Sequence, residues 1–162
     1  MSRWNTFILL VAITAIAFAQ PVPVEFLSHK SPDSIRVIKG PDGKLLADGS
    51  LVYAIRMRDG KPGMPRPGTG LAENESIIQK TQINPDRVVP GEISFVMTVC
   101  DNDEFWKPHQ GIKGEKIFLR VFATTDTLLP KGTAYAETPL YTLPELPHSI
   151  DGVTIGQWKK IP

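Results

Sequence analysis

The sequence predicts an all-β domain, an antiparallel β-sandwich of about seven to nine short strands. Three observations lead to this fold class. Short apolar runs alternate with polar residues along the chain, 15 Pro and 13 Gly punctuate them, and no segment shows a long helical period. Asp-Gly pairs at 42–43, 48–49, 59–60 and 151–152 supply the positive φ angles that tight turns need.

Three runs show the two-residue alternation most clearly, and each is expected to be a strand: 51–57, 93–100 and 116–122. One face of each run is apolar, made by Leu51, Tyr53, Ile55 and Met57, by Ile93, Phe95, Met97 and Val99, and by Ile117, Leu119 and Val121. Paired sheets would hide one such set of side chains from water.

Weaker strand patterns and two long loops fill the rest of the chain. Further strands are expected at 24–27, 34–39, 77–83, 136–143 and 153–158, whereas 72–80 is the one segment compatible with a helical turn or two. Residues 59–70 contain three Pro and four Gly, which excludes regular structure there. Residues 100–114 form a polar loop with an aromatic pair, and the loops at the ends of a sandwich are where binding sites usually form.

Residues 1–19 are predicted to be a cleavable secretory signal peptide, which leaves residues 20–162 as a single β-sandwich domain. Arg3 precedes an apolar run, and Ala17-Phe18-Ala19 fits the small-x-small cleavage pattern. The alternative is an uncleaved anchor, but the run from 7 to 19 has 13 residues, and a spanning helix needs about 20. We therefore expect a secreted, periplasmic or cell-surface protein without membrane insertion after cleavage.

Composition narrows the class of partner. Cleavage would remove Arg3 and leave 17 basic and 17 acidic residues, and this balance argues against nucleic-acid binding. Cys100 is the single cysteine, so no internal disulfide can form, which suits a bacterial exported protein. We expect its thiol to be buried and inert, with an intermolecular disulfide or a reactive thiol as the alternatives.

The polar loop carries the candidate sites. Asp101, Asp103 and Glu104 follow a strand together, and their carboxylates are the oxygen ligands that calcium prefers. No other cofactor is expected, and a solvated acidic turn is the alternative interpretation.

An aromatic pair lies beside these acids. Phe105 and Trp106, with His109 nearby, form a candidate ligand-binding site in which an exposed indole stacks on a sugar ring. The alternative is that both rings fold back over the edge of the core.

The second half of the chain loosely resembles the immunoglobulin-like β-sandwich modules of secreted bacterial proteins. The resemblance lies in residues 114–122 (GEKIFLRVF), 132–135 (GTAY) and 139–143 (PLYTL), although the Cys…Trp…Cys spacing of antibody domains is absent. It implies an adhesive, spacer or carbohydrate-associated unit without catalysis.

No motif of a known catalytic class is present: G-x-S-x-G, H-E-x-x-H and a phosphate-cradling Gly loop are all missing. We therefore expect a non-catalytic exported module that contacts a protein or polysaccharide at the cell exterior. A carbohydrate-binding or calcium-dependent module is one alternative. A small exported enzyme is the other, and it would require a pocket with convergent polar groups and perturbed pKa values.

Overall fold

The computed structural model describes residues 22–28, 37–57, 60–83, 91–100, 111–112, 114–143 and 148–162. These residues contain no helix and form ten strands: β1 (Val22–Leu27), β2 (Leu51–Met57), β3 (Glu75–Gln82), β4 (Ser94–Cys100), β5 (Gly111–Ile112), β6 (Lys116–Phe122), β7 (Ala134–Glu137), β8 (Tyr141–Thr142), β9 (His148–Ile150) and β10 (Lys159–Lys160). The all-β prediction is confirmed. The helical turn or two with which the segment 72–80 is compatible does not form, because β3 occupies most of that segment, in agreement with the strand expected at 77–83.

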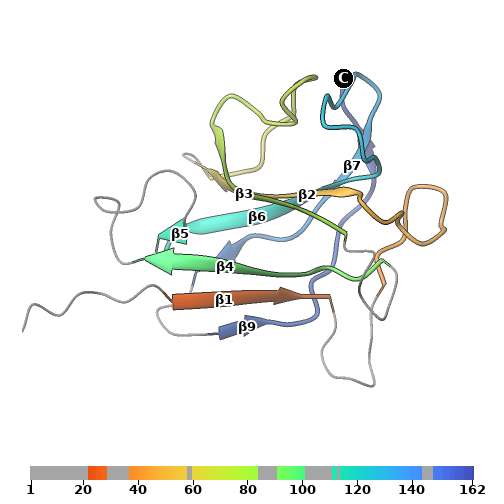
Figure 1. Cartoon of the computed structure of the whole chain (residues 1–162). Coiled ribbons are helices and arrows are strands. Elements are labelled where there is room, and N and C mark those ends of the chain that lie inside the picture. The colour runs from red at the N-terminus through yellow and green to blue at the C-terminus, as the bar shows by residue number, and fades with distance from the viewer. Residues whose placement is uncertain are drawn as a thin grey trace, which may run out of the picture.

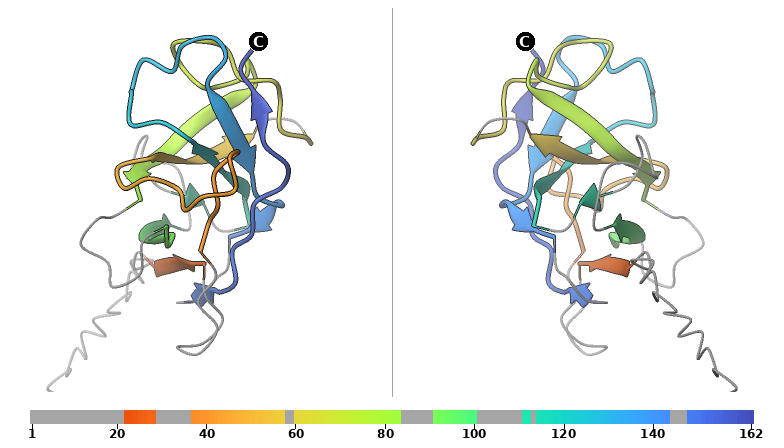
Figure 2. Two further views of the ribbon diagram at one scale, coloured as in Figure 1. Left: turned by 90° about the vertical axis from the view of Figure 1, so that its right-hand side faces the viewer. Right: turned by 90° about the vertical axis from the view of Figure 1, so that its left-hand side faces the viewer.

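The strands form two sheets that lie in separate layers (Figures 1 and 2). The four-strand sheet has the order β5-β4-β1-β9, and the six-strand sheet has the order β10-β7-β6-β2-β3, with β8 also paired to β6. The six-strand sheet is antiparallel throughout. The four-strand sheet is mixed instead of antiparallel, because β9 runs parallel to β1 and β5 runs parallel to β4.

The main core fills the space between the two layers. The alternation expected for 93–100 and 116–122 is confirmed here, since Met97 of β4 and Leu119 of β6 lie in this core with Val24 and Phe26 of β1. For β2 the expected face is wrong: Val52 and Ala54 meet the other sheet, and the face of Leu51, Tyr53 and Ile55 lies on the opposite side. Full burial of each such side chain contributes about 1.5–3 kcal/mol to folding.

A second core covers the opposite face of the six-strand sheet. Two loops, residues 60–74 and residues 123–133, lie over that face, above the sheet in Figure 1. The side chains that they help to bury are Leu51, Tyr53, Ile55, Phe118, Phe122, Leu129, Tyr135 and Ile161. As a result, β2 and β6 are buried on both faces, and residues 117–122 are inaccessible to solvent on either side.

The segment 148–162 connects the two sheets. After β9 pairs with β1, Val153 N–H donates to Leu27 O at 2.9 Å, and Gly156 N–H then donates to Glu137 O at 2.7 Å. β10 completes the crossing by pairing with β7. The strand expected at 153–158 is therefore a crossover segment, and the paired residues come directly after it.

Other strand boundaries also differ from those expected. The run 136–143 is divided between β7 and β8 and interrupted at 138–140. Among residues 37–39, the described part of the strand expected at 34–39, Lys39 forms an isolated bridge with Leu45. The predicted signal peptide, residues 1–19, lies outside the described residues. Within the described ranges, no helix has the length and apolar character needed to cross a membrane.

Candidate functional site

Arg120 is the largest fully buried side chain of the described chain, and it lies on the loop-covered face of β6. Its guanidinium donates to both carboxylate oxygens of Glu75, at 2.6 and 3.0 Å, and to Oε1 of Glu137 at 2.5 and 2.9 Å. It also donates to Gly70 O at 2.8 Å and to Gly63 O at 3.0 Å. Every guanidinium nitrogen thus has a protein acceptor, which makes this cluster a clamp on the 60–74 loop and leaves no donor for a ligand.

The remaining charges of the cluster are also matched within the protein. Glu75 accepts the N–H groups of Gly63 and Ala72 at 2.8 and 2.7 Å, and Lys159 donates to Glu137 at 3.1 Å. Two cations therefore neutralise two carboxylates. This balance satisfies the requirement that buried charges be paired and hydrogen-bonded.

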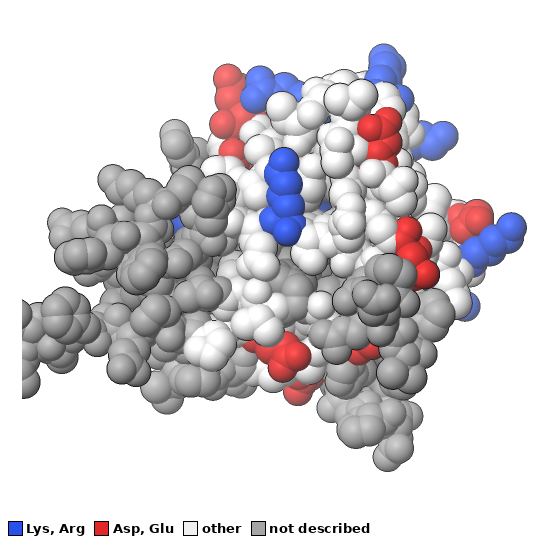
Figure 3. Space-filling view, in the orientation of Figure 1, with Lys and Arg blue, Asp and Glu red and all other residues white. Residues whose placement is uncertain are grey.

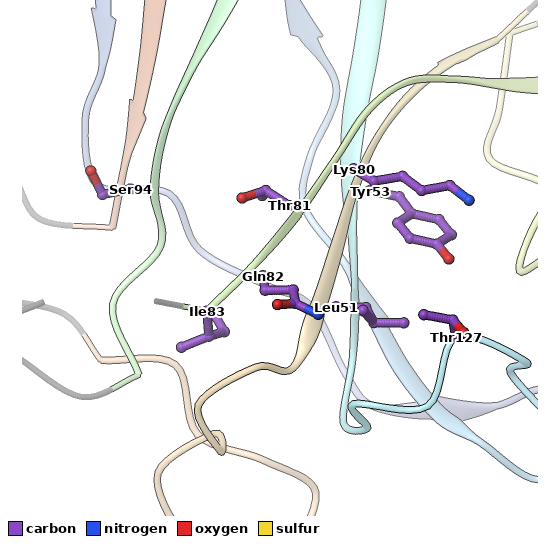
Figure 4. Close-up of a pocket in the computed structure, with 8 residues that line it drawn as sticks. All are labelled: Leu51, Tyr53, Lys80, Thr81, Gln82, Ile83, Ser94 and Thr127. Atoms are coloured by element: carbon purple, nitrogen blue, oxygen red, sulfur yellow. The ribbon is translucent and has the colours of Figure 1, made fainter. Parts of the chain in front are cut away.

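A groove of about 520 Å³ at the free edge of the six-strand sheet is the candidate functional site (Figure 4). We call it the edge groove. The six-strand sheet contributes Leu51, Tyr53, Lys80, Thr81 and Gln82. Ile83, Ser94 and Thr127 complete the lining.

Strand register explains how the edge groove is built. Tyr53 of β2 is paired with Lys80 of β3, and Leu51 is paired with Gln82, so these side chains share one face of the sheet. Thr81 points to the opposite side of β3, toward β4, as Figure 4 shows. The groove therefore extends around both sides of an edge strand.

An aromatic ring and a cation meet on the loop-side wall of the edge groove. Lys80 Nζ lies 5.1 Å from the centroid of the Tyr53 ring, a distance at which the ammonium is attracted to the π-electrons. Burial raises the pKa of the Tyr53 hydroxyl above its ordinary value of 10.0, so this phenol stays neutral at physiological pH. Thr127, on the 123–133 loop, adds an exposed hydroxyl across from them.

The backbone edge of β3 is open beside the groove. No strand among the described residues pairs with the side of β3 that faces away from β2. One side-chain hydrogen bond joins this edge to the four-strand sheet: Gln79 Nε2 donates to Val96 O at 3.1 Å. Ser94 Oγ is buried in the groove wall and has no hydrogen-bond partner in the described part of the chain.

A second groove, of about 600 Å³, lies between the 37–46 turn and the crossover segment. Trp158 joins its two sides, because the indole N–H donates to Lys39 O at 2.9 Å. The ring also packs against the main core. This groove lacks the open strand edge that distinguishes the edge groove.

The site residues expected from the sequence all fall in 101–110, outside the described residues. Calcium binding by Asp101, Asp103 and Glu104 therefore stays a prediction, and a melting curve with and without calcium would test it. Ligand binding by Phe105, Trp106 and His109 also stays a prediction. Within the described ranges, no three His, Cys, Asp or Glu side chains are grouped closely enough to hold a metal ion.

Sequence reasoning missed the residues that line the edge groove. The alternation of β2 placed Leu51 and Tyr53 on one face, but that signal equally describes a buried core strand. Nothing in the local pattern around Lys80 indicated that β3 would be an edge strand next to an aromatic ring.

Charged side chains of both signs are scattered over the described part of the face shown in Figure 3, and uncharged side chains separate them. The structure thus defines a class, a two-layer β protein with an open sheet edge beside a mixed polar and aromatic groove. No protein-family model, curated protein or solved structure matches this chain.

Proposed function

We propose that this chain is an exported, non-catalytic β-sandwich module of the immunoglobulin-like type that acts by contact with a macromolecule outside the cell. The edge groove is the contact surface. The observation that carries this proposal is the open edge of β3 beside a groove whose wall combines an aromatic ring, an ammonium group and hydroxyls. Open strand edges and such mixed grooves are both sites where partners bind.

The described tyrosines are not suited to act as general bases near neutral pH. Burial raises the pKa values of Tyr53, Tyr135 and Tyr141, with Glu137 adding to the effect at Tyr135. A general base must lose its proton near the working pH, and these shifts move the three phenols away from that range. The buried cluster around Arg120 is likewise committed to internal hydrogen bonds.

Site-directed photo-crosslinking on intact cells of the source organism tests this function. The full chain, carrying a diazirine side chain at position 82, is expected to form a discrete cross-linked product after export. The matched control carries the same group at position 44, an exposed site in the 37–46 turn, and is expected to give no such product. Equal yields at both positions, or none at either, would exclude the edge groove as the contact surface.

A further inference from the structure

We infer that the edge groove binds an extended peptide that adds a strand to β3 and places a carboxylate against Lys80. This inference rests on the function proposed above, because it names the chemistry of the partner at the same surface. Three features support it: the direction of the β3 backbone groups, the charge of the groove and the feature that opposes self-pairing.

The backbone of β3 presents hydrogen-bonding groups to the groove. Ile83 N–H donates to Ser50 O at 2.8 Å, which directs the amide and carbonyl of Ile83 toward the β2 side. In an antiparallel pair the direction alternates along the strand, so Thr81 also faces β2 and Lys80 and Gln82 face the open edge. A peptide strand offers donors and acceptors at the matching spacing, whereas a polysaccharide chain has no such backbone repeat.

The charge of the groove selects for an anionic partner. Lys80 is the one charged residue among the described residues that line the groove, and its side chain is exposed. No carboxylate of the described chain forms an ion pair with it. An aspartate or glutamate on the incoming strand would therefore add a charge-assisted hydrogen bond without displacing an internal one.

The charge of Lys80 opposes pairing of β3 with a second copy of the chain. A symmetric antiparallel pair centred on Lys80 would bring two ammonium groups together, and lysine on an edge strand is a common protection against such pairing. The register shift between Ala54 and Ile55 places an extra residue in β3 before Lys80, so the segment from Lys80 to Gln82 is the regular part of the edge to which a strand can add. The groove is thus suited to a foreign strand that brings a compensating negative charge.

Selection from a displayed library of random linear peptides tests the inference. The full-length protein is expected to enrich peptides with Asp or Glu at one fixed position between β-branched or aromatic residues. The variant Lys80→Glu is expected to enrich Lys or Arg at that position, and the matched control Lys44→Glu is expected to enrich the same peptides as the unchanged protein. The inference would be overturned if the selected peptides shared no acidic position, or if Lys80→Glu enriched the same peptides as the unchanged protein.

Two measurements on a selected peptide separate the carboxylate from the backbone pairing. Replacing its acidic residue with the corresponding amide is expected to weaken binding about tenfold to the unchanged protein and hardly at all to Lys80→Met. Amide hydrogen exchange at positions 80 and 82 is expected to slow in the complex. Binding without that protection would overturn the strand-addition geometry.

The outcomes also distinguish this inference from the proposed function. Cross-linking at position 82 to a polysaccharide, or to a protein while no linear peptide is enriched, would overturn the peptide inference and leave the module's surface-contact role intact. If neither the cross-link at position 82 nor peptide enrichment is observed, the proposed function and the peptide inference are both overturned.

Discussion

Arg120 and Glu75 form a two-bond ion pair that is completely buried, although 45 residues separate them in the chain. The pair joins the central strand β6 to the start of the edge strand β3 and, through Gly63 and Gly70, to the loop between β2 and β3. The first residue of the edge strand β3, Glu75, is thus fixed by an ion pair to β6, the strand on the other side of β2.

Replacing Arg120 with Met is expected to destabilise the fold by about 3–5 kcal/mol, because it leaves the buried carboxylate of Glu75 without a cation and Glu137 with Lys159 alone. Urea unfolding would measure this loss, and proteinase K would cleave sooner within residues 60–74. Arg66→Met is the matched control, since Arg66 lies exposed on the same loop. A loss below about 1 kcal/mol for Arg120→Met would contradict the role of the clamp.

Gly70→Ala is expected to be far more damaging than Gly68→Ala. Both glycines have positive φ, 67° and 84°, so both substitutions carry the cost of about 1–2 kcal/mol for a left-handed residue. A Cβ at position 70 would also lie 2.5 Å from Leu129 Cδ1 and 2.7 Å from Phe122 Cζ, whereas nothing lies within 4 Å at position 68. Thermal unfolding should show an additional loss of about 1–3 kcal/mol for Gly70→Ala, and equal losses would refute the close packing.

Leu128 and Leu129 are neighbours with opposite roles. Leu129 is 0% exposed and has a φ of 45°, and Leu128 is 73% exposed. Leu129→Ala should lower the free energy of unfolding by about 2–5 kcal/mol, because it empties a site between the 123–133 loop and the sheet. Leu128→Ala should change it by no more than about 0.5 kcal/mol. Denaturant unfolding of the two variants makes the comparison, and a reversed order would show that the loop does not anchor through Leu129.

Alkaline pH is expected to destabilise the chain through its buried tyrosines. The folded state raises the pKa of Tyr53 above 10.0, so it holds the phenolic proton more tightly than the unfolded state does. This contribution is fully present below about pH 10 and is lost as pH rises, by at most about 1.4 kcal/mol per pH unit for one tyrosine. The melting temperature should therefore fall less steeply above pH 10 for Tyr53→Phe than for the unchanged protein. If the two proteins lose stability in parallel, ionisation of Tyr53 does not contribute to the alkaline destabilisation.

Lys80→Val should promote self-association, because it removes the charge that opposes pairing between two β3 edges. Sedimentation at increasing protein concentration would reveal dimers or larger species. Lys44→Val makes the same change of side chain away from any strand edge and should remain unaffected. If both variants sediment like the unchanged chain, Lys80 does not protect the edge.

Strand identity was largely predictable because two-residue periodicity is local. The runs 51–57 and 116–122 are strands with the bounds expected, and Leu119 faces the inter-sheet core as its position indicated. In the run 51–57 the opposite face, with Val52, meets that core, because loops cover the face that carries Leu51 and Tyr53. The strand predicted at 153–158 is wrong because its apolar residues do pack against the core, as a strand's would, but its backbone crosses between the two sheets. A pattern of local hydrophobicity does not distinguish these two cases.

Burial of the second face was not predicted, because it depends on loops that are distant in sequence. Arg120 looked like the polar member of an alternating strand, yet Glu75 and Glu137 come from other parts of the chain to pair with it. The adjacent residues Phe118 and Phe122 carried a usable signal, since strands that are apolar on both sides are typical of sheets covered on both faces.

The edge groove could not be predicted for a related reason. Tyr53 and Lys80 meet through strand register, and the register includes an irregularity that no local pattern announces. A strand lies at the edge of a sheet when no other strand pairs with one of its sides, and this depends on the arrangement of all the strands.

The crossover made by residues 148–162 has a consequence for folding during synthesis. The other strands of both sheets precede these residues in the chain, so until residues 148–160 are synthesised β1 lacks its parallel neighbour β9 and β7 lacks its second neighbour β10. Each sheet therefore keeps one additional unpaired edge up to that point, and the link between the two layers forms only after β1 to β8 have been made.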